Sequence, residues 1–319
     1  MEHTGFLGKS NLRVPRMGVG VMTWGQPSGM SRWTPAQMAY GPSHGREAEQ
    51  DAFDTSLAAG IDLFDTAAVY SNGASEQRLG ELAHGRDVTI ATKFPGSFFG
   101  SHRDFPQTMA KSLERLGRNT IDLYQIHFTS RRLVIPELMK SMADAVEAGK
   151  VRAVGVSNYS AAEMRLAHAE LAKRGIPLAS NQVQYSLLYR KPEVDGVLDA
   201  CLELGVTLIA YSPLASGALT GKYSSQKKAG GLRRFMSSFR GEGIQAVQPV
   251  VALLREIGDR YGKTPSQVAV RWLIEKEMVL PIPGAKNGPQ AAENVGALTF
   301  TLTPEELDAL DRATLAWRK

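Results

Sequence analysis

The chain has 319 residues, of which 43% are hydrophobic and 22% are charged, and its formal net charge is +5. This composition is that of an ordinary globular protein and excludes a low-complexity or fibrous one. Since the charge is mild and the basic residues are scattered, we expect no nucleic-acid partner. No run approaches the roughly 20 apolar residues of a membrane-spanning helix, so we expect no membrane partner either.

The cysteine content and the N-terminus bear on the compartment. The single cysteine, Cys201, excludes an internal disulfide framework and fits a reducing compartment. The first residues lack the basic stretch and the apolar run of a secretory signal. We therefore expect a cytoplasmic protein, with a removed organellar transit peptide left open. The chain is expected to be a monomer or a homo-oligomer.

Short apolar runs alternate with amphipathic stretches along the chain. The runs that we expect to form strands are 17–22, 61–66, 88–93, 121–127, 153–157, 180–184, 206–211 and 279–283. The helices expected between them include 46–59, 76–83, 105–116, 136–148, 161–174 and 193–204. Continuous apolar strands indicate burial on both faces, as in parallel sheets. Eight such units over this length predict a (β/α)₈ TIM barrel that forms a single domain over residues 1–319.

An open doubly wound sheet would show the same alternation of strands and helices. Such a sheet normally carries the glycine-rich turn G-x-G-x-x-G after its first strand. Gly18 and Gly20 begin this pattern, but Thr23 stands at the third glycine position. The sequence therefore favours the barrel.

Residues 214–243 form a long connection, rich in Gly, Ser, Lys and Arg, after the seventh expected strand. Loops of this length in a compact domain are usually functional or disordered. Residues 244–269 then predict two helices, the second with Thr264 as its N-cap and Pro265 at its first position. Thr303 and the proline after it repeat this signal, which predicts an extra C-terminal helix outside the barrel.

Four polar side chains stand where three consecutive expected strands end. Asp65 lies at the end of the second expected strand, with Tyr70 shortly after it, and Lys93 and His127 end the next two strands. Barrel enzymes carry their active sites at the face where the carboxyl ends of the strands meet. We therefore expect these four side chains to lie together.

A phenol, an ammonium, a carboxylate and an imidazole in one place suit proton delivery to a carbonyl oxygen. The ordinary pKa of tyrosine, about 10, is too high for efficient proton transfer near neutral pH. We expect the Lys93 ammonium to lower the pKa of Tyr70, and Asp65 to keep Lys93 charged and in place. His127 would orient the substrate oxygen, and Tyr70 would donate the proton while hydride arrives from a nicotinamide.

These segments resemble the catalytic tetrad motifs of the aldo-keto reductases. The stretch FDTA at 64–67 with Tyr70, the pair TK at 92–93 and the stretch LYQIH at 123–127 match the family's motifs. The resemblance extends from Gly18 to about Leu310 and is to bacterial, cyanobacterial and plastid members near the potassium-channel β-subunit branch. It implies reduction of small-molecule aldehydes or ketones with NADP(H), or with NAD(H).

The resemblance also implies a nicotinamide site in the second half of the barrel. Tyr211 matches the aromatic residue that stacks beneath the nicotinamide ring and so fixes the face that meets the substrate. The other contacts implied here, to the carboxamide and the pyrophosphate, are Ser157, Asn158, Gln182, Ser212 and Leu214.

The adenosine end of the cofactor is implied after the last strand. Lys286 would face the 2′-phosphate, near a helix start whose N–H groups suit phosphate. Gln290 stands where many family members have arginine, which weakens the electrostatic preference for NADPH. The other contacts implied at this end are Gly284, Glu293 and Asn294. In the 214–243 loop the resemblance implies that Lys222 contacts the pyrophosphate, with Arg233 assisting it.

The substrate side is less defined. Trp24 follows the first expected strand and is expected to wall the carbonyl pocket, with Phe128, Phe98 and Phe99 adding apolar surface. Residues 26–44 have no clear counterpart in the family, and an extra lid that selects the substrate is one interpretation. Scattered histidines and one cysteine predict no metal site.

Two other functions stay open at this point. A redox-sensing or regulatory subunit would keep the barrel and the cofactor with slow turnover, as channel β subunits largely do. A Schiff-base aldolase would use Lys93 as its nucleophile. Asp65 beside Lys93 disfavours the aldolase, since it keeps the lysine charged.

Overall fold

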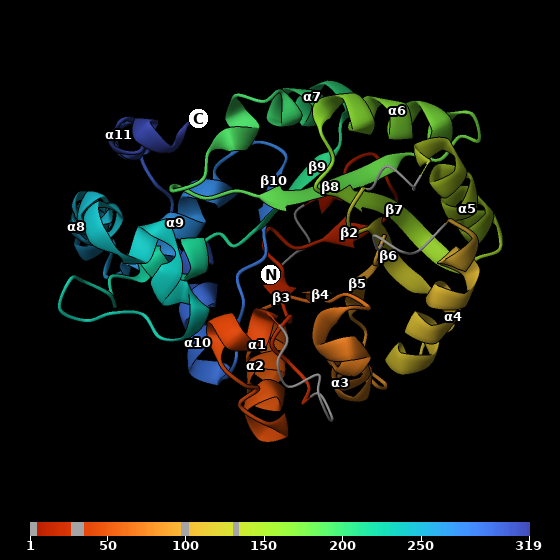
Figure 1. The fold of residues 1–319 in the computed structure, drawn as a ribbon, viewed down its shortest axis with the longest axis horizontal. Helices are drawn as coiled ribbons and strands as arrows, with labels where there is room; N and C mark the ends of the chain where they lie inside the picture. Colours follow the sequence, from red (N-terminus) through yellow and green to blue (C-terminus); the bar gives the residue numbers. More distant parts are fainter. Residues whose placement is uncertain (1–4, 27–34, 97–101, 130–133) are drawn as a thin grey trace.

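The computed structural model of the protein describes residues 5–26, 35–96, 102–129 and 134–319. Eight parallel strands follow one another around a barrel in the order of the chain (Figure 1). They are β3 (Val19–Gly20), β4 (Leu63–Asp65), β5 (Thr89–Phe94), β6 (Ile121–Ile126), β7 (Val151–Ser157), β8 (Leu178–Gln184), β9 (Thr207–Tyr211) and β10 (Val279–Pro281).

The barrel closes between its first and last strands. Gly20 forms a parallel bridge with Gly284, and the Gly20 N–H donates to the Pro283 carbonyl at 3.1 Å. An open doubly wound sheet would leave these two edges unpaired, so the prediction of a (β/α)₈ fold is confirmed.

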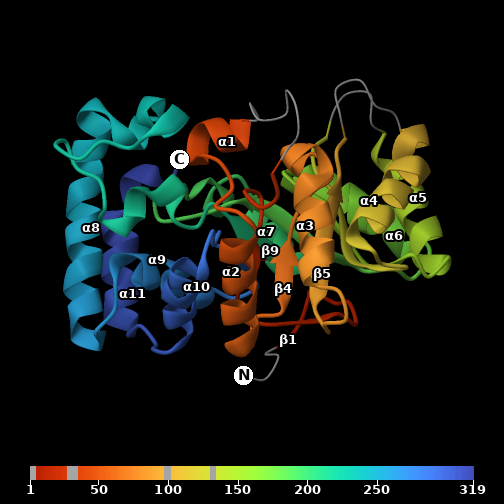
Figure 2. The same cartoon turned by 90° about the horizontal axis from the view of Figure 1, so that it is seen from below.

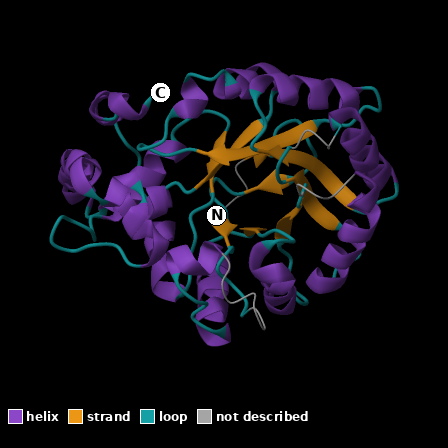
Figure 3. Ribbon diagram, viewed as in Figure 1, coloured by secondary structure: helices purple, strands orange, loops and turns teal. Residues whose placement is uncertain are grey.

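Most of the helices form an outer ring around the strands, and α1 lies at one end of the barrel (Figure 2 and Figure 3). The helices of the described ranges are α1 (Pro35–Tyr40), α2 (Arg46–Ala58), α3 (Ala74–Leu82), α4 (Phe105–Leu116), α5 (Ile135–Glu147), α6 (Ala161–Ala172), α7 (Val197–Leu204), α8 (Gly241–Tyr261), α9 (Pro265–Ile274), α10 (Gly288–Val295) and α11 (Pro304–Ala313). The helix expected at 193–204 begins later, because residues Lys191–Glu193 form a separate 3₁₀ turn. Among the helices of the described ranges, none has the length and apolarity needed to cross a bilayer.

The predicted helix starts at Thr264 and Thr303 are confirmed. Each hydroxyl accepts a hydrogen bond from the third residue of its helix, and the side chain of that residue, Gln267 or Glu306, accepts from the N-cap N–H in return. The two helices expected over 244–269 are α8 and α9. They are separated at Gly262, whose φ of 63° is the left-handed conformation that favours glycine.

The N-terminal end of the barrel is closed by a hairpin that the sequence did not predict. Strands β1 (Gly5–Phe6) and β2 (Arg13–Val14) pair antiparallel, and Leu7 and Leu12 between them are buried. They pack against the inward side chains of the barrel strands, among them Leu63. Figure 2 shows β1 at the opposite end of the barrel from α1. The open end is therefore the one where the strands finish.

The 214–243 connection forms turns at that end. It contains the 3₁₀ turns η5 (Ala215–Thr220), η6 (Gly231–Phe235) and η7 (Ser237–Phe239), and α8 begins at Gly241. Turn η6 packs against α1, a segment almost 200 positions earlier in the sequence, whose Ala39 accepts a hydrogen bond from Arg233. The 214–243 connection and α1 thus meet over the open end of the barrel.

Candidate active site

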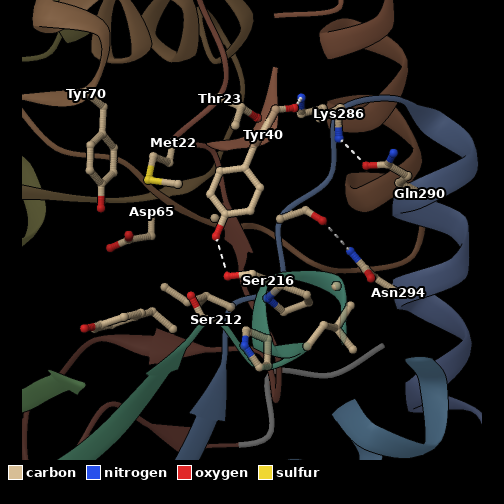
Figure 4. A pocket seen from close by; sticks show the side chains of 18 of the residues that line it. Met22, Thr23, Tyr40, Asp65, Tyr70, Ser212, Ser216, Lys286, Gln290 and Asn294 are labelled. Carbon is tan, nitrogen blue, oxygen red and sulfur yellow. Dashed lines mark hydrogen bonds between the residues drawn. The ribbon is translucent and has the colours of Figure 1, made fainter. Parts of the chain in front are cut away.

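A cavity of about 960 Å³ opens where the barrel strands finish (Figure 4). This volume lies at the upper end of the usual range for ligand clefts, roughly 300–1,000 Å³. The residues predicted for the site that line it are Asp65, Tyr70, His127, Phe128, Ser157, Asn158, Gln182, Tyr211, Ser212, Leu214, Lys222, Arg233, Gly284, Lys286, Gln290, Glu293 and Asn294.

Lys93 lies directly beneath the cavity and is completely buried. Its Nζ donates to Asp65 Oδ1 at 2.5 Å and to the Thr66 carbonyl at 2.7 Å. It also lies 5.1 Å from the centroid of the Tyr70 ring. Burial by itself lowers the pKa of Lys93, but the neighbouring Asp65 and Tyr70 outweigh burial, so the pKa is raised and the ammonium stays charged.

The Asp65 carboxylate is held by more than the lysine. Its Oδ2 accepts hydrogen bonds from Gln182 Nε2 at 2.8 Å and from Gln125 Nε2 at 3.2 Å. Gln125 lies on β6 and was not among the predicted site residues. Its signal in the sequence is its place two residues before His127, which puts both side chains on the same face of the strand.

Tyr70 begins a 3₁₀ turn, η2 (Tyr70–Gly73), that follows β4. Burial raises the pKa of the Tyr70 phenol, the charge of Lys93 lowers it, and the charge of Asp65 raises it. The net result is a pKa above the ordinary value of 10. The prediction that Lys93 brings the pKa of Tyr70 below its ordinary value is therefore wrong in its net direction, because burial outweighs the cation. At neutral pH the phenol holds its proton.

His127 follows β6 and faces the same space. Its ring meets that of Tyr70 edge-on, with centroids 5.7 Å apart, and stacks on Phe128 at 4.2 Å. Burial, and after it the charge of Lys93, lower the pKa of His127 to about 3. The imidazole is neutral at physiological pH, and its buried Nδ1 has no hydrogen-bond partner among the described residues.

A hydrogen-bond network joins these side chains to the residues expected at the nicotinamide. Tyr211 donates its hydroxyl to Asn158 Oδ1 at 3.1 Å, and Asn158 Nδ2 donates to the His127 carbonyl at 3.1 Å. Ser157 Oγ donates to the Gln182 carbonyl at 2.7 Å. The ends of β7, β8 and β9 are thus tied to the strand that carries His127.

The backbone after β9 takes an unusual path beside Tyr211. Ser212, Ala215, Ser216 and Gly217 have φ values of 53°, 48°, 56° and 97°. Left-handed conformations of non-glycine residues are costly, and they cluster at ligand sites where the surrounding structure holds them. Such turns direct successive N–H groups toward one point and suit an anion. Ser212 and Leu214, predicted for the pyrophosphate, belong to this segment.

Positive charge gathers at the other end of the cavity. Lys286 is half-buried, and burial followed by the nearby Arg233 lowers the pKa of its ammonium. The Lys286 N–H donates to Gln290 Oε1 at 3.0 Å. Lys222 forms a 3.7 Å ion pair with Glu293. The residues predicted for the adenosine end therefore lie together, and Lys222 and Arg233, predicted for the pyrophosphate, lie beside them.

Trp24 does not wall the cavity. It is fully buried, packs against Phe64 with ring centroids 6.1 Å apart, and donates Nε1–H to the Ala285 carbonyl at 2.7 Å. The chain turns after β3, where the Trp24 N–H bonds to the Val21 carbonyl, and this turn directs the ring into the core. Met22 and Thr23 line the cavity in its place.

The other predictions for the substrate pocket concern three phenylalanines and the segment 26–44. Phe128 lines the cavity and is about half exposed, whereas Phe98 and Phe99 lie outside the described residues. Of the segment 26–44, the described part brings Tyr40 and His44 to the cavity. Neither residue was predicted individually, because the sequence of segment 26–44 does not show which of its side chains reach the cavity.

Comparison with known proteins identifies the family of this chain. The model of the Aldo/keto reductase family matches residues 16–314. The chain belongs to the aldo-keto reductases. An uncharacterised oxidoreductase of Mycobacterium bovis is 39% identical to this aldo-keto reductase over 315 residues, which cover 96% of this chain and 91% of that protein. The chloroplastic pyridoxal reductase of Arabidopsis thaliana is 37% identical over 319 residues, covering 95% and 84%.

A solved structure agrees with this assignment. A thermostable aldo-keto reductase in complex with the inhibitor epalrestat superposes with a TM-score of 0.74 at 28% identity, covering 98% of this chain and all of the other. Family membership makes this aldo-keto reductase an oxidoreductase.

Proposed function

We propose that this aldo-keto reductase reduces aldehydes and ketones to alcohols, with NADPH as the hydride donor and Tyr70 as the proton donor. The observation that carries the proposal is the buried Lys93 ammonium between Asp65 and Tyr70, beneath the cavity that the expected cofactor residues line. A carbonyl that accepts hydride needs a proton at its oxygen, and this arrangement holds one ready.

The cavity fits a nicotinamide dinucleotide. Tyr211, only partly buried at the cavity wall, supplies a flat ring for the nicotinamide, and the strained turn at 212–217 supplies N–H groups for the pyrophosphate. Lys286 and Arg233 supply positive charge at the far end, which supports NADPH over NADH although Gln290 is uncharged. When bound, the dihydronicotinamide supplies the hydride, and the chain supplies the proton and the positioning.

Each member of the buried cluster has a role in the proton transfer. Tyr70 keeps its proton at neutral pH because its pKa is raised, so it is available as the acid. Lys93 stabilises the phenolate that remains after the transfer, and Asp65 keeps Lys93 charged. A positioned acid of this kind typically accelerates a reaction by roughly 10²–10⁴-fold.

His127 is proposed to position the substrate oxygen. As a neutral imidazole it carries one N–H, which can donate to a carbonyl without the charge of an imidazolium. Its stacking on Phe128 and its edge contact with Tyr70 fix the ring. The carbonyl oxygen would then lie between the imidazole and the phenol.

The walls near this point favour an apolar or aromatic carbonyl compound. Among the described residues, Met22, Val69 and Phe128 line the cavity beside the phenol and the imidazole. Apolar side chains bind apolar rings and chains and leave a polar substrate body without partners. The relative named pyridoxal reductase is consistent with an aromatic aldehyde.

The Schiff-base alternative is disfavoured by the geometry of Lys93. An amine nucleophile must be uncharged and accessible, whereas Lys93 has a raised pKa, is fully buried and donates to Asp65 and Thr66. A nucleotide-binding redox sensor with slow turnover is the second candidate, favoured by the contacts of Tyr40 and Arg233 across the cavity.

A single-turnover assay tests the proposal. The protein is saturated with NADPH and mixed with an aromatic aldehyde such as benzaldehyde, and the loss of NADPH absorbance is followed together with alcohol formation. Rapid oxidation with stoichiometric alcohol is expected. Bound NADPH that is not oxidised by any aldehyde or ketone of a broad panel would favour the sensor, and no binding of NADPH would refute the proposal.

A further inference from the structure

Tyr40 lies across the cavity rather than along its wall. Its side chain extends from the end of α1, and its hydroxyl lies 2.8 Å from Ser216 Oγ, in the strained turn after β9 (Figure 4). These two residues belong to opposite sides of the cleft and to segments far apart in the chain. Their hydrogen bond therefore bridges the opening.

The backbone around Tyr40 is held by two cations of the cleft. Arg233 donates Nε–H to the Ala39 carbonyl at 3.0 Å and Nη1–H to the Ser216 carbonyl at 3.3 Å, so one guanidinium binds both sides of the bridge. Its Cζ also lies 5.6 Å from the centroid of the Tyr40 ring. Lys286 Nζ donates to the carbonyl oxygens of Tyr40 and Pro42.

The other end of segment 38–44 is anchored to α2. Ser43 Oγ donates to Glu49 Oε1 at 2.5 Å, and the same carboxylate accepts from the Gly25 N–H at 3.0 Å and from Arg78. Glu49 lies on α2 and is buried. Residues 38–44 are thus anchored to the buried Glu49 at one end. At the Tyr40 end they are joined across the cleft by the Tyr40–Ser216 hydroxyl pair and by Arg233.

We propose that Tyr40 is a cofactor-retaining residue, whose hydrogen bond to Ser216 clasps residues 38–44 over the bound dinucleotide. This inference rests on the proposed nucleotide-dependent function. Ser216 belongs to the turn proposed for the pyrophosphate and Lys286 to the adenosine end, so the clasp crosses the middle of the nucleotide. Release of the nucleotide requires the Tyr40–Ser216 bond to open first, and Lys286 couples the clasp to the phosphate that it binds.

Nucleotide dissociation is the step that the clasp controls. Loss of one hydrogen bond of this kind corresponds to a change of about 2–10-fold in an equilibrium or rate constant. We expect Tyr40→Phe and Ser216→Ala each to raise the dissociation rate of NADPH by such a factor. Because the two hydroxyls act on each other, the double variant should show little increase beyond either single variant.

The experiment measures NADPH dissociation by stopped-flow fluorescence, with the preformed complex mixed against excess NADP⁺. Tyr261→Phe is the matched control, since it removes a phenol hydroxyl that donates to Glu306 at 2.8 Å and does not line the cavity. The Tm of each variant is measured alongside, so that a variant that fails to fold is recognised and replaced by Tyr40→Leu with Ser216→Val.

The outcomes separate the clasp from the function on which it rests. Faster dissociation in Tyr40→Phe and Ser216→Ala, without additivity and without an effect of Tyr261→Phe, supports the clasp. An unchanged rate in Tyr40→Phe, fully additive effects, or an equal effect of Tyr261→Phe overturns it. If the wild-type protein oxidises NADPH with aldehydes while these rates stay unchanged, the clasp fails alone; if it binds no nicotinamide nucleotide, the proposed function fails with it.

Discussion

Lys93 Nζ lies 2.5 Å from Asp65 Oδ1, and both side chains are buried, Asp65 at the wall of the cavity and Lys93 behind it. Removing one partner from a buried ion pair leaves the other without compensation and typically costs about 3–5 kcal/mol. Because Asp65 also accepts from Gln125 and Gln182, it holds three donors from three different strands in one place.

Asp65→Asn should therefore destabilise the fold by an amount of about 3–5 kcal/mol and lower the pKa of Lys93. Denaturant unfolding measures the first effect. Asp308→Asn is the control, because its ion pair with Arg312 is exposed and should contribute little. Equal stability losses in the two variants would show that the buried pair has no special role.

Tyr70→Phe should reduce the rate of carbonyl reduction by roughly 10²–10⁴-fold. The ring that contacts His127 remains, so the affinity for NADPH should not change. Steady-state rates with an aromatic aldehyde and fluorescence titration with NADPH measure the two quantities, with Tyr261→Phe as the control phenol. Wild-type turnover in Tyr70→Phe would rule out Tyr70 as the proton donor.

Much of the fold was predictable because its signals are local. The helix starts at Thr264 and Thr303 are determined by cap residues that lie within one turn, and Asp65, Lys93 and His127 lie at or just after the ends of mainly apolar strands. The N-terminal hairpin was not predictable, because each of its strands has two residues and it is held by packing of Leu7 and Leu12 against the barrel.

The residues of the site also divide into those that local sequence signals located and those that they did not. Side chains that follow strand ends, such as Lys93, were located because the barrel brings strand ends together. Trp24 was misplaced, since a single turn after β3 decides whether its ring faces the cavity or the core. Tyr40 was missed as an individual residue because its partner Ser216 is 176 positions away, and no periodic pattern reports such a contact.

The neutral His127 predicts a pH dependence of stability. Its pKa is about 3 in the folded protein, against an ordinary value of 6.5. Between these values the unfolded chain binds a proton that the folded protein does not, so stability falls as the pH drops below about 6.5 and continues to fall toward about 3. The slope from this one group reaches at most about 1.4 kcal/mol per pH unit.

Denaturant unfolding between pH 7 and pH 4 tests this expectation, with His127→Asn and with His84→Asn as a control on the exposed surface. The wild type and His84→Asn should lose stability more steeply than His127→Asn. Parallel pH profiles for all three proteins would contradict a buried, neutral imidazole.

Lys286→Ala should weaken the binding of NADPH by roughly tenfold or more and the binding of NADH much less. The reason is that a charge-assisted hydrogen bond to the 2′-phosphate, a group that NADH lacks, is typically worth about 1.5–3 kcal/mol. The ammonium has three donors and uses two of them on the carbonyl oxygens of Tyr40 and Pro42, so one remains for the phosphate.

Dissociation constants for both nucleotides measure the effect of Lys286→Ala. The control is Lys228→Ala, which removes an equal charge from an exposed position outside the cavity. Equal losses for NADPH and NADH in Lys286→Ala would mean that Lys286 acts only through the segment that it holds over the cleft, and the preference for NADPH would then need another cause.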